Sequence, residues 1–195
     1  MWAKVESNTI TQLIHRPKAI LVGDIQHPHN IFNLWSEAEL KAIGIYSVTV
    51  DNTNRKDNEW YKNTDITYTY NSGADTVTGA YGTATAKDLD DTLWTQADSD
   101  AGLLPEEKSV GDSKGNGLKT LEKNTINDRA GNLLQKYDWY TLRAARGGTA
   151  IPSAVSTYQT AVTTKSNEHQ VAIDAVSTVD ALAALTFDWP DEPTL

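Results

Sequence analysis

The chain has 195 residues, a formal net charge of -9 and no cysteine. This length allows one domain or two small ones, and a hydrophobic share of 39% predicts a thin or divided core. The negative charge argues against a nucleic-acid partner and against an anionic membrane surface, because both need clustered Lys and Arg. The lack of cysteine excludes a disulfide framework and a thiolate zinc site, and it fits synthesis in a reducing cytosol.

Neither a secretory leader nor a membrane-spanning helix is predicted. The segment Met1–Glu6 carries polar residues where a signal peptide needs an apolar core. No apolar run approaches the roughly 18 residues that a transmembrane helix needs. We therefore expect a chain that works without a membrane.

The first part of the chain predicts a small β-rich domain over residues 1–86. Residues 2–15 alternate in polarity on either side of Ser7-Asn8, which indicates a β-hairpin whose turn type the sequence leaves open. Residues 64–81 carry two strand patterns around the turn cluster 71–75, which is the best hairpin signal in the chain.

One short helix is expected in this domain, over residues 36–42. Ser36 stands at the N-cap with Glu39 three residues later, which is the pattern of a capping box. Gly44 can end the helix in the left-handed conformation. Residues 45–50 then return to strand composition.

Residues 87–117 change in character and predict an acidic, Gly-containing linker. Between residues 87 and 107, seven acidic residues stand against one basic residue. Such a composition buries little apolar surface, so we expect a flexible bridge between two domains. The glycines at its end do not form a phosphate-binding loop, because Lys114 precedes Gly115 instead of following it.

Residues 118–195 predict an antiparallel helical hairpin domain with a C-terminal aromatic tail. Apolar residues recur near one face of a helix over 118–136. A short helix is expected over 139–145, and Gly147-Gly148 ends it. A long helix follows over 153–175. The fold class is therefore expected to be α+β.

The long helix carries a heptad-like seam that is expected to pack against the helix before it. Its members alternate in spacings of three and four residues: Val155, Tyr158, Val162, Lys165, His169, Ala172 and Val176. A histidine in such a seam is expected to pack there or to contact a partner. One more short helix is expected over 179–185, before the aromatic tail at 187–190.

Few residues suggest covalent chemistry. His27 and His29 lie two apart, so on a strand their side chains would point the same way and could share a metal ion with Asp24 or His15. The alternative is a proline-containing loop with two solvated imidazoles, and no recognised ligand spacing follows. No catalytic triad order, nucleophile elbow or catalytic carboxylate pair stands out. We therefore predict a protein that is not an enzyme and holds no metal or cofactor, with a metal-dependent hydrolase centred on His27 and His29 as the minor alternative.

Aromatic and arginine side chains in the helical part are the predicted binding residues. Arg143 and Arg146 lie one turn apart beside Trp139 and Tyr140, and they could stack on those rings or bind the carboxylate of a partner. Charge that favours the helix dipole is the alternative role for Arg143 and Arg146. Because aromatic and Arg anchors dominate interface energetics, we predict a protein interface formed by Trp139, Tyr140, Arg143, Tyr158 and Trp189.

Several runs in the helical part carry a family resemblance. They are Gly131–Arg143 with its Leu-Leu and Asp-Trp pairs, Gly147–Pro152 with Ile-Pro, Tyr158–Val162 and Phe187–Pro190 with the closing Trp-Pro. These runs resemble the C-terminal helical domain of tailed-bacteriophage tail proteins and tail-fibre assembly proteins. Residues 35–40 and 42–45 are similar to the small domain that precedes it. The family usually has Tyr-Arg where this chain has Tyr158-Gln159.

The resemblance implies a structural protein of the virion tail, made in the host bacterial cytoplasm. Such a protein acts by protein–protein binding, as an adaptor at the baseplate or fibre. Its partners would be other tail proteins, and it would form an oligomer within a larger assembly, without nucleic acid or membrane. A tail-fibre assembly chaperone is the alternative that the same resemblance allows.

Overall fold

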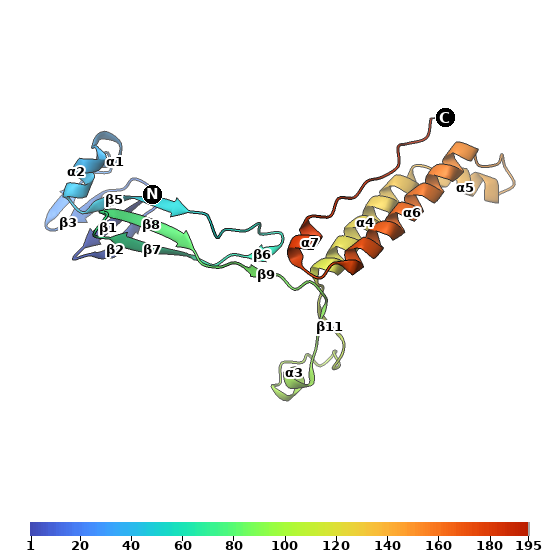
Figure 1. Cartoon of the computed structure of the whole chain (residues 1–195), viewed down its shortest axis with the longest axis horizontal. Helices are drawn as coiled ribbons and strands as arrows, with labels where there is room; N and C mark the ends of the chain where they lie inside the picture. Colours follow the sequence, from blue (N-terminus) through green and yellow to red (C-terminus); the bar gives the residue numbers. More distant parts are fainter. Residues whose placement is uncertain (195) are drawn as a thin grey trace. The chain divides into compact units, whose positions relative to one another are not determined.

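The computed structural model describes residues 1–194 and divides the chain into two compact units. The first runs from Met1 to Thr85 and is built on β-strands, and the second begins at Ala86 and consists mainly of helices (Figure 1). Each unit has its own cluster of buried apolar side chains. The broad prediction of an α+β protein, with strands in the N-terminal part and helices after it, is confirmed.

A curled five-stranded sheet forms the first unit, in the order β2-β1-β5-β8-β7. Its strands are β1 (Trp2–Glu6), β2 (Thr9–Ile14), β5 (Ile45–Asp51), β7 (Ile66–Asn71) and β8 (Thr76–Tyr81). Neighbouring strands run antiparallel except β5 and β8, which are parallel. The edge strands β2 and β7 come close to each other without pairing, so the sheet curls on itself.

Short elements complete this unit. They are β3 (Ile20–Val22) paired with β4 (Ile25–His27), β6 (Tyr61–Lys62) paired with β9 (Thr85–Ala86), and helices α1 (Ile31–Leu34) and α2 (Glu37–Ala42). The prediction of a single short helix is therefore wrong, because α1 precedes α2. No side chain caps α1, but Ile31 and Phe32 are buried. Packing therefore stabilises this short helix, which the local sequence does not predict.

Apolar side chains cover both faces of the sheet. One face packs with the short helices and buries Ile14, Ile20, Ile31, Phe32, Leu40 and Ile45. The other face buries Ala3, Tyr46 and Val77. The neighbours Ile45 and Tyr46 belong to opposite faces, as the two-residue period of a strand requires. A thin core on each side of one sheet agrees with the low hydrophobic content.

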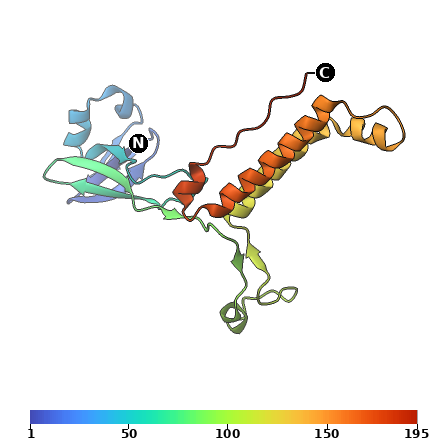
Figure 2. The same cartoon turned by 45° about the vertical axis from the view of Figure 1, so that its right-hand side comes forward.

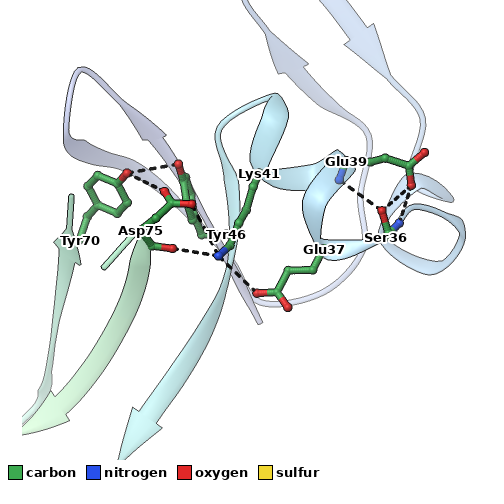
Figure 3. Close-up of polar contacts among 7 residues, drawn as sticks. All are labelled: Ser36, Glu37, Glu39, Lys41, Tyr46, Tyr70 and Asp75. Carbon is green, nitrogen blue, oxygen red and sulfur yellow. Dashed lines mark hydrogen bonds and ion pairs between the residues drawn. The ribbon is translucent and has the colours of Figure 1, made fainter. Parts of the chain in front are cut away.

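The predicted β-hairpins and capping box are confirmed. Ser7 and Asn8 join β1 to β2 with φ values of +48° and +62°, which identifies a type I′ turn. At the start of α2, the Ser36 hydroxyl accepts from Glu39 N, and Ser36 N donates to the Glu39 carboxylate at 2.7 Å (Figure 3). The Ser36 hydroxyl also donates to this carboxylate at 2.7 Å, and this bond together with the one from Ser36 N lowers the pKa of Glu39.

Polar side chains join α2 to the turn between β7 and β8 (Figure 3). Lys41 Nζ lies 3.8 Å from Glu37 Oε1 and donates to Asp75 O at 2.9 Å. The Tyr70 hydroxyl donates to Asp75 Oδ1 at 3.0 Å and lies 3.3 Å from the Tyr46 hydroxyl. The hydrogen bond with Tyr70 and burial raise the pKa of Tyr46, while hydrogen bonds from Tyr46 and Tyr70 lower the pKa of Asp75. The Tyr46 hydroxyl therefore stays protonated and the Asp75 carboxylate stays charged near neutral pH. These groups are suited to holding the turn in place and not to transferring a proton.

Two antiparallel helices form the body of the second unit, α4 (Leu118–Gln135) and α6 (Ser153–Ala175) (Figure 1). The Gln170 amide donates to Asn127 Oδ1 at 3.0 Å, and Lys123 pairs with Asp174, so the first half of α4 meets the end of α6. Helix α5 (Asp138–Ala145) lies between them in the chain, and α7 (Val179–Ala183) follows α6.

The seam on α6 differs from the predicted one at two buried positions. The buried residues of α6 are Val155, Tyr158, Val162, Ser166, His169 and Ile173. Ser166 and Ile173 take the places that the heptad pattern gave to Lys165 and Ala172. The observed spacing averages 3.6 residues, because a helix that packs on a single neighbour follows its own period and not the 3.5-residue period of a supercoil.

The segment 87–117 contains more structure than the flexible linker that composition predicted. Its elements are β10 (Thr92–Leu93), α3 (Gln96–Asp100) and β11 (Ser113–Gly115), and β10 pairs with β11. Thr95 and Asp98 form a second capping box. Lys114 Nζ lies 2.6 Å from Asp98 Oδ1 and 4.6 Å from the centre of the Trp94 ring. The bond from Lys114, with those from Thr95, lowers the pKa of Asp98.

The same segment also holds the start of α4. Gly117 N donates to Asp91 Oδ1 at 2.7 Å, and Leu118 N donates to Asp88 O at 2.9 Å. The first N–H groups of a helix lack partners within the helix. Here the backbone oxygen of Asp88 and the side chain of Asp91 accept hydrogen bonds at the start of α4, as an N-cap residue usually does. The hydrogen bond from Gly117 lowers the pKa of Asp91.

Replacing Gly131 by Ala should stabilise the second unit. Gly131 lies on the exposed side of α4, and an added Cβ would meet nothing within 4 Å. Because Gly in a helix interior costs roughly 0.5–1 kcal/mol relative to Ala, the thermal transition of the helical unit should move up by a few degrees. Circular dichroism at 222 nm measures this shift. A lowered melting temperature would contradict the exposed position of residue 131.

Candidate binding surface at the helix tip

Three of the predicted binding residues lie together on α5, at the end of the helix pair. The guanidinium carbon of Arg143 lies 4.6 Å from the centre of the Trp139 ring and 5.2 Å from that of Tyr140. The two rings are tilted against each other with centroids 4.7 Å apart. Arg143 stands four residues after Trp139 and three after Tyr140, the spacings at which side chains meet on a helix. The cation–π stacking suggested by the sequence is present.

Exposed apolar side chains surround this stack. Trp139 is 53% exposed and Leu142 is 56% exposed. Together with Arg143, Arg146 and Gly148 they line an open hollow of about 440 Å³, and these five residues are called the tip surface below. Large apolar side chains beside guanidinium groups are typical of a protein-binding site, because both kinds of residue are enriched at interfaces.

The loop after α5 fixes the position of Arg143. Gly147 ends the helix with φ +80°, and Gly148 N donates to Arg143 O at 3.0 Å. Arg143 Nη2 donates to Ala150 O at 3.4 Å. Arg143 Nε is buried, and among residues 1–194 it has no hydrogen-bond partner. The loop therefore holds the guanidinium in place. Because the buried Nε is out of reach, a partner's carboxylate would bind through the Nη donors.

The other two predicted binding residues belong to the interior of this unit. Tyr158 is 4% exposed and packs edge-on against Tyr137 at 5.2 Å. Trp189 is partly buried and meets His169 edge-on at 5.2 Å. In this chain Tyr158 offers no exposed face to a partner, and His169 packs in the seam. Of the five predicted residues, Trp139 is the one that is largely exposed, whereas Tyr140 and Arg143 are partly buried. Tyr140 packs against the same core cluster as Trp189, and Tyr158 is buried within that cluster.

A second group of exposed apolar residues was not foreseen. Leu93, Leu103 and Val110 lie in or beside the loop between β10 and β11, and each is about half exposed or more. Glu106 and Glu107 give the same loop a negative charge. No periodic pattern marks these leucines, because the loop has little regular structure around them. The tip surface, by contrast, was detectable from helical spacing.

The metal-site alternative gains no geometric support. Strand β4 ends at His27, so His29 does not share a strand face with it. The His27 ring instead packs edge-on against Trp35 at 5.4 Å. Across residues 1–194, no group of three or more His, Asp or Glu side chains is arranged to hold a metal ion.

The tip surface is suited to binding. Guanidinium groups stay charged and donate hydrogen bonds, while the exposed indole and leucine supply apolar area.

Within the part of the chain that the structure describes, no helix is long and apolar enough to span a membrane. No protein-family model, curated protein or solved structure matches this chain.

Proposed function

We propose that this chain is a structural protein of a bacteriophage tail, acting as an adaptor that binds other tail proteins at the baseplate or fibre. The observation that carries the proposal is the tip surface, where Trp139 and Leu142 are exposed beside the stacked Arg143. A rigid aromatic and Arg group at the end of a helix pair is what an interface anchor requires. The resemblance of residues 131–190 to phage tail proteins supplies the class of partner.

In this proposal, α4, α5 and α6 act as a helical hairpin that presents the tip surface. The tip carries Arg143 and Arg146 in a chain of net charge -9, so an acidic partner surface complements it. The β-rich unit would meet a second tail protein, with residues 87–117 between the two. An adaptor with two binding ends gains avidity when both are engaged. Copies of the chain would associate within the virion.

Changing Trp139 to Ala should reduce incorporation of the chain into particles by roughly tenfold or more, because loss of a central interface aromatic typically removes about 2 kcal/mol of binding. Leu121→Ala is the matched control, since Leu121 is also about half exposed but lies on α4 outside the tip surface. Quantitative mass spectrometry of purified particles measures incorporation, and the melting temperature reports folding. Equal incorporation of both variants would show that the Trp139 ring does not contribute to binding in the particle.

A tail-fibre assembly chaperone remains the second candidate, because an exposed apolar tip also suits temporary capping of another protein. The two functions differ in the mature particle. A structural adaptor should be present in purified virions at a constant ratio to the other tail proteins. Presence during assembly followed by absence from mature virions would replace the structural proposal with the chaperone.

A further inference from the structure

The residues after α7 form an extended segment along the helix pair (Figure 2), and residues 185–194 are called the arm below. Its central contact is His169, which lies in the buried seam of α6. Asp188 O lies 2.8 Å from His169 Nε2, and a carbonyl can only accept, so this nitrogen donates. The rings of Phe187 and Trp189 meet the imidazole edge-on at 5.1 and 5.2 Å.

Acidic residues of the arm meet lysines on both long helices. Asp188 Oδ2 lies 3.0 Å from Lys165 Nζ on α6, and Glu192 pairs with Lys136 at the end of α4. The arm is thus held at three points. One is the group of Phe187 and Trp189 around His169, called the aromatic clasp, and the other two are the ion pairs. Both ion pairs involve exposed side chains, so each contributes little alone and the clasp at His169 provides most of the attachment.

The arm has the properties of a bound peptide. Pro190 and Pro193 restrict its backbone, which lowers the entropy lost on docking. Residues 185–194 contain no helix or strand, so side chains and one carbonyl make the contacts described above. Between the arm and α6 lies an open hollow of about 410 Å³, lined in part by Tyr158, whose buried hydroxyl lacks a hydrogen-bond partner among the described residues. The arm therefore leaves open space between itself and the first half of α6.

We propose that the arm is exchanged between copies, so that the arm of one chain binds His169 and Lys165 on α6 and Lys136 at the end of α4 in a second copy. The occupant is fixed by complementarity, because these residues match the order of aromatic and acidic residues that every copy carries. Exchange replaces each contact by an identical one, which makes it a low-cost route to association. Val179 and Leu182 stay buried in α7, so the segment that moves begins after Ala184.

Concentration decides how much exchange occurs. The arm of the same chain competes with the arm of a second copy for the same binding residues. Its effective concentration is high, on the order of millimolar for a short connection. Copies fixed beside one another in an assembly reach comparable values. Arm exchange would explain how copies join within the proposed oligomer, and in that sense it rests on the proposed function. Its test uses purified protein and needs no particle. A negative result would refute arm exchange and leave the proposed role of the tip surface to its own test, incorporation into particles.

The absence of cysteine makes a direct crosslinking test possible. A Lys165→Cys chain and a longer, tagged Asp188→Cys chain are mixed, concentrated and treated with a bismaleimide crosslinker, because the long Lys165 side chain bridges a gap that a disulfide would not span. A crosslinked dimer of the two should form, with a yield that rises with protein concentration and falls several-fold when the Asp188→Cys chain also carries Trp189→Ala. Asn167→Cys is the matched control for Lys165→Cys, because Asn167 is exposed on the same helix away from the arm.

The double variant Lys165→Cys/Asp188→Cys separates the remaining outcomes. If the bismaleimide links the two cysteines within one chain while the mixed single variants give no dimer at any concentration, the arm stays on its own helices and exchange is refuted. If neither crosslink forms, the arm does not lie beside Lys165 in solution and the proposal also fails. A mixed dimer that forms equally well with Asn167→Cys would show random collision and would count against exchange.

Discussion

Replacing Gly117 by Ala should destabilise the helical unit by roughly 2–3 kcal/mol, the range expected when atoms are forced into a filled site. A Cβ at residue 117 would lie 2.7 Å from Leu89 O and closer still to the carbonyl group of Asp90. These are backbone atoms, which cannot move aside as a side chain can. Gly117 N also donates to Asp91 Oδ1, so a shift that relieves the clash would break that bond.

Gly131→Ala is the matched control for Gly117→Ala, because it makes the same chemical change in the same helix. The two variants should move stability in opposite directions, up for Gly131→Ala and down for Gly117→Ala. Thermal unfolding followed at 222 nm measures both. Similar melting temperatures for the two variants would mean that residues 88–91 do not hold the start of α4, and would restore the view of 87–117 as a free linker.

Replacing Gly44 by Ala should destabilise the β-rich unit by about 3 kcal/mol. The φ of Gly44 is +77°, and the left-handed conformation costs an Ala roughly 1–2 kcal/mol. In addition, a Cβ there would lie 2.7 Å from Val5 O. Val5 N donates to Gly44 O at 2.8 Å, which holds the two backbones together and prevents relaxation.

Gly23→Ala separates strain from collision in this experiment. Gly23 has φ +58°, but an added Cβ would meet nothing within 4 Å, so only the conformational cost of roughly 1–2 kcal/mol should appear. Urea unfolding followed by tryptophan fluorescence, in a background that carries Trp94→Phe, Trp139→Phe and Trp189→Phe, reports the first unit through Trp2 and Trp35, which pack against its core. Equal losses for both variants would contradict the close approach of Gly44 to β1.

Features encoded by neighbouring residues were predictable from the sequence. The capping box at Ser36 and Glu39 lies within four residues, and so does the turn in which Asn71 Oδ1 accepts from Gly73 N at 3.0 Å. The group of Trp139, Tyr140 and Arg143 was predictable for the same reason, because helical spacing alone brings these side chains together.

Features that depend on distant residues were not predictable. Helix α1 exists because Ile31 and Phe32 find a core built from remote strands, and the parallel pairing of β5 with β8 joins segments far apart in sequence. Composition predicted a linker at 87–117, since counting acids cannot reveal that Asp98 pairs with Lys114. The burial of Tyr158 follows from its place in the seam, where an aromatic residue serves packing better than recognition.

The central claim is that the chain acts through a tip surface covered by another protein in the particle. A cryo-EM map of the tail, at a resolution that shows side chains, tests this most directly. The account predicts that Trp139 and Leu142 lie buried against a neighbouring protein, with an acidic side chain at Arg143. A map that contains this chain with Trp139 and Leu142 facing solvent would contradict it.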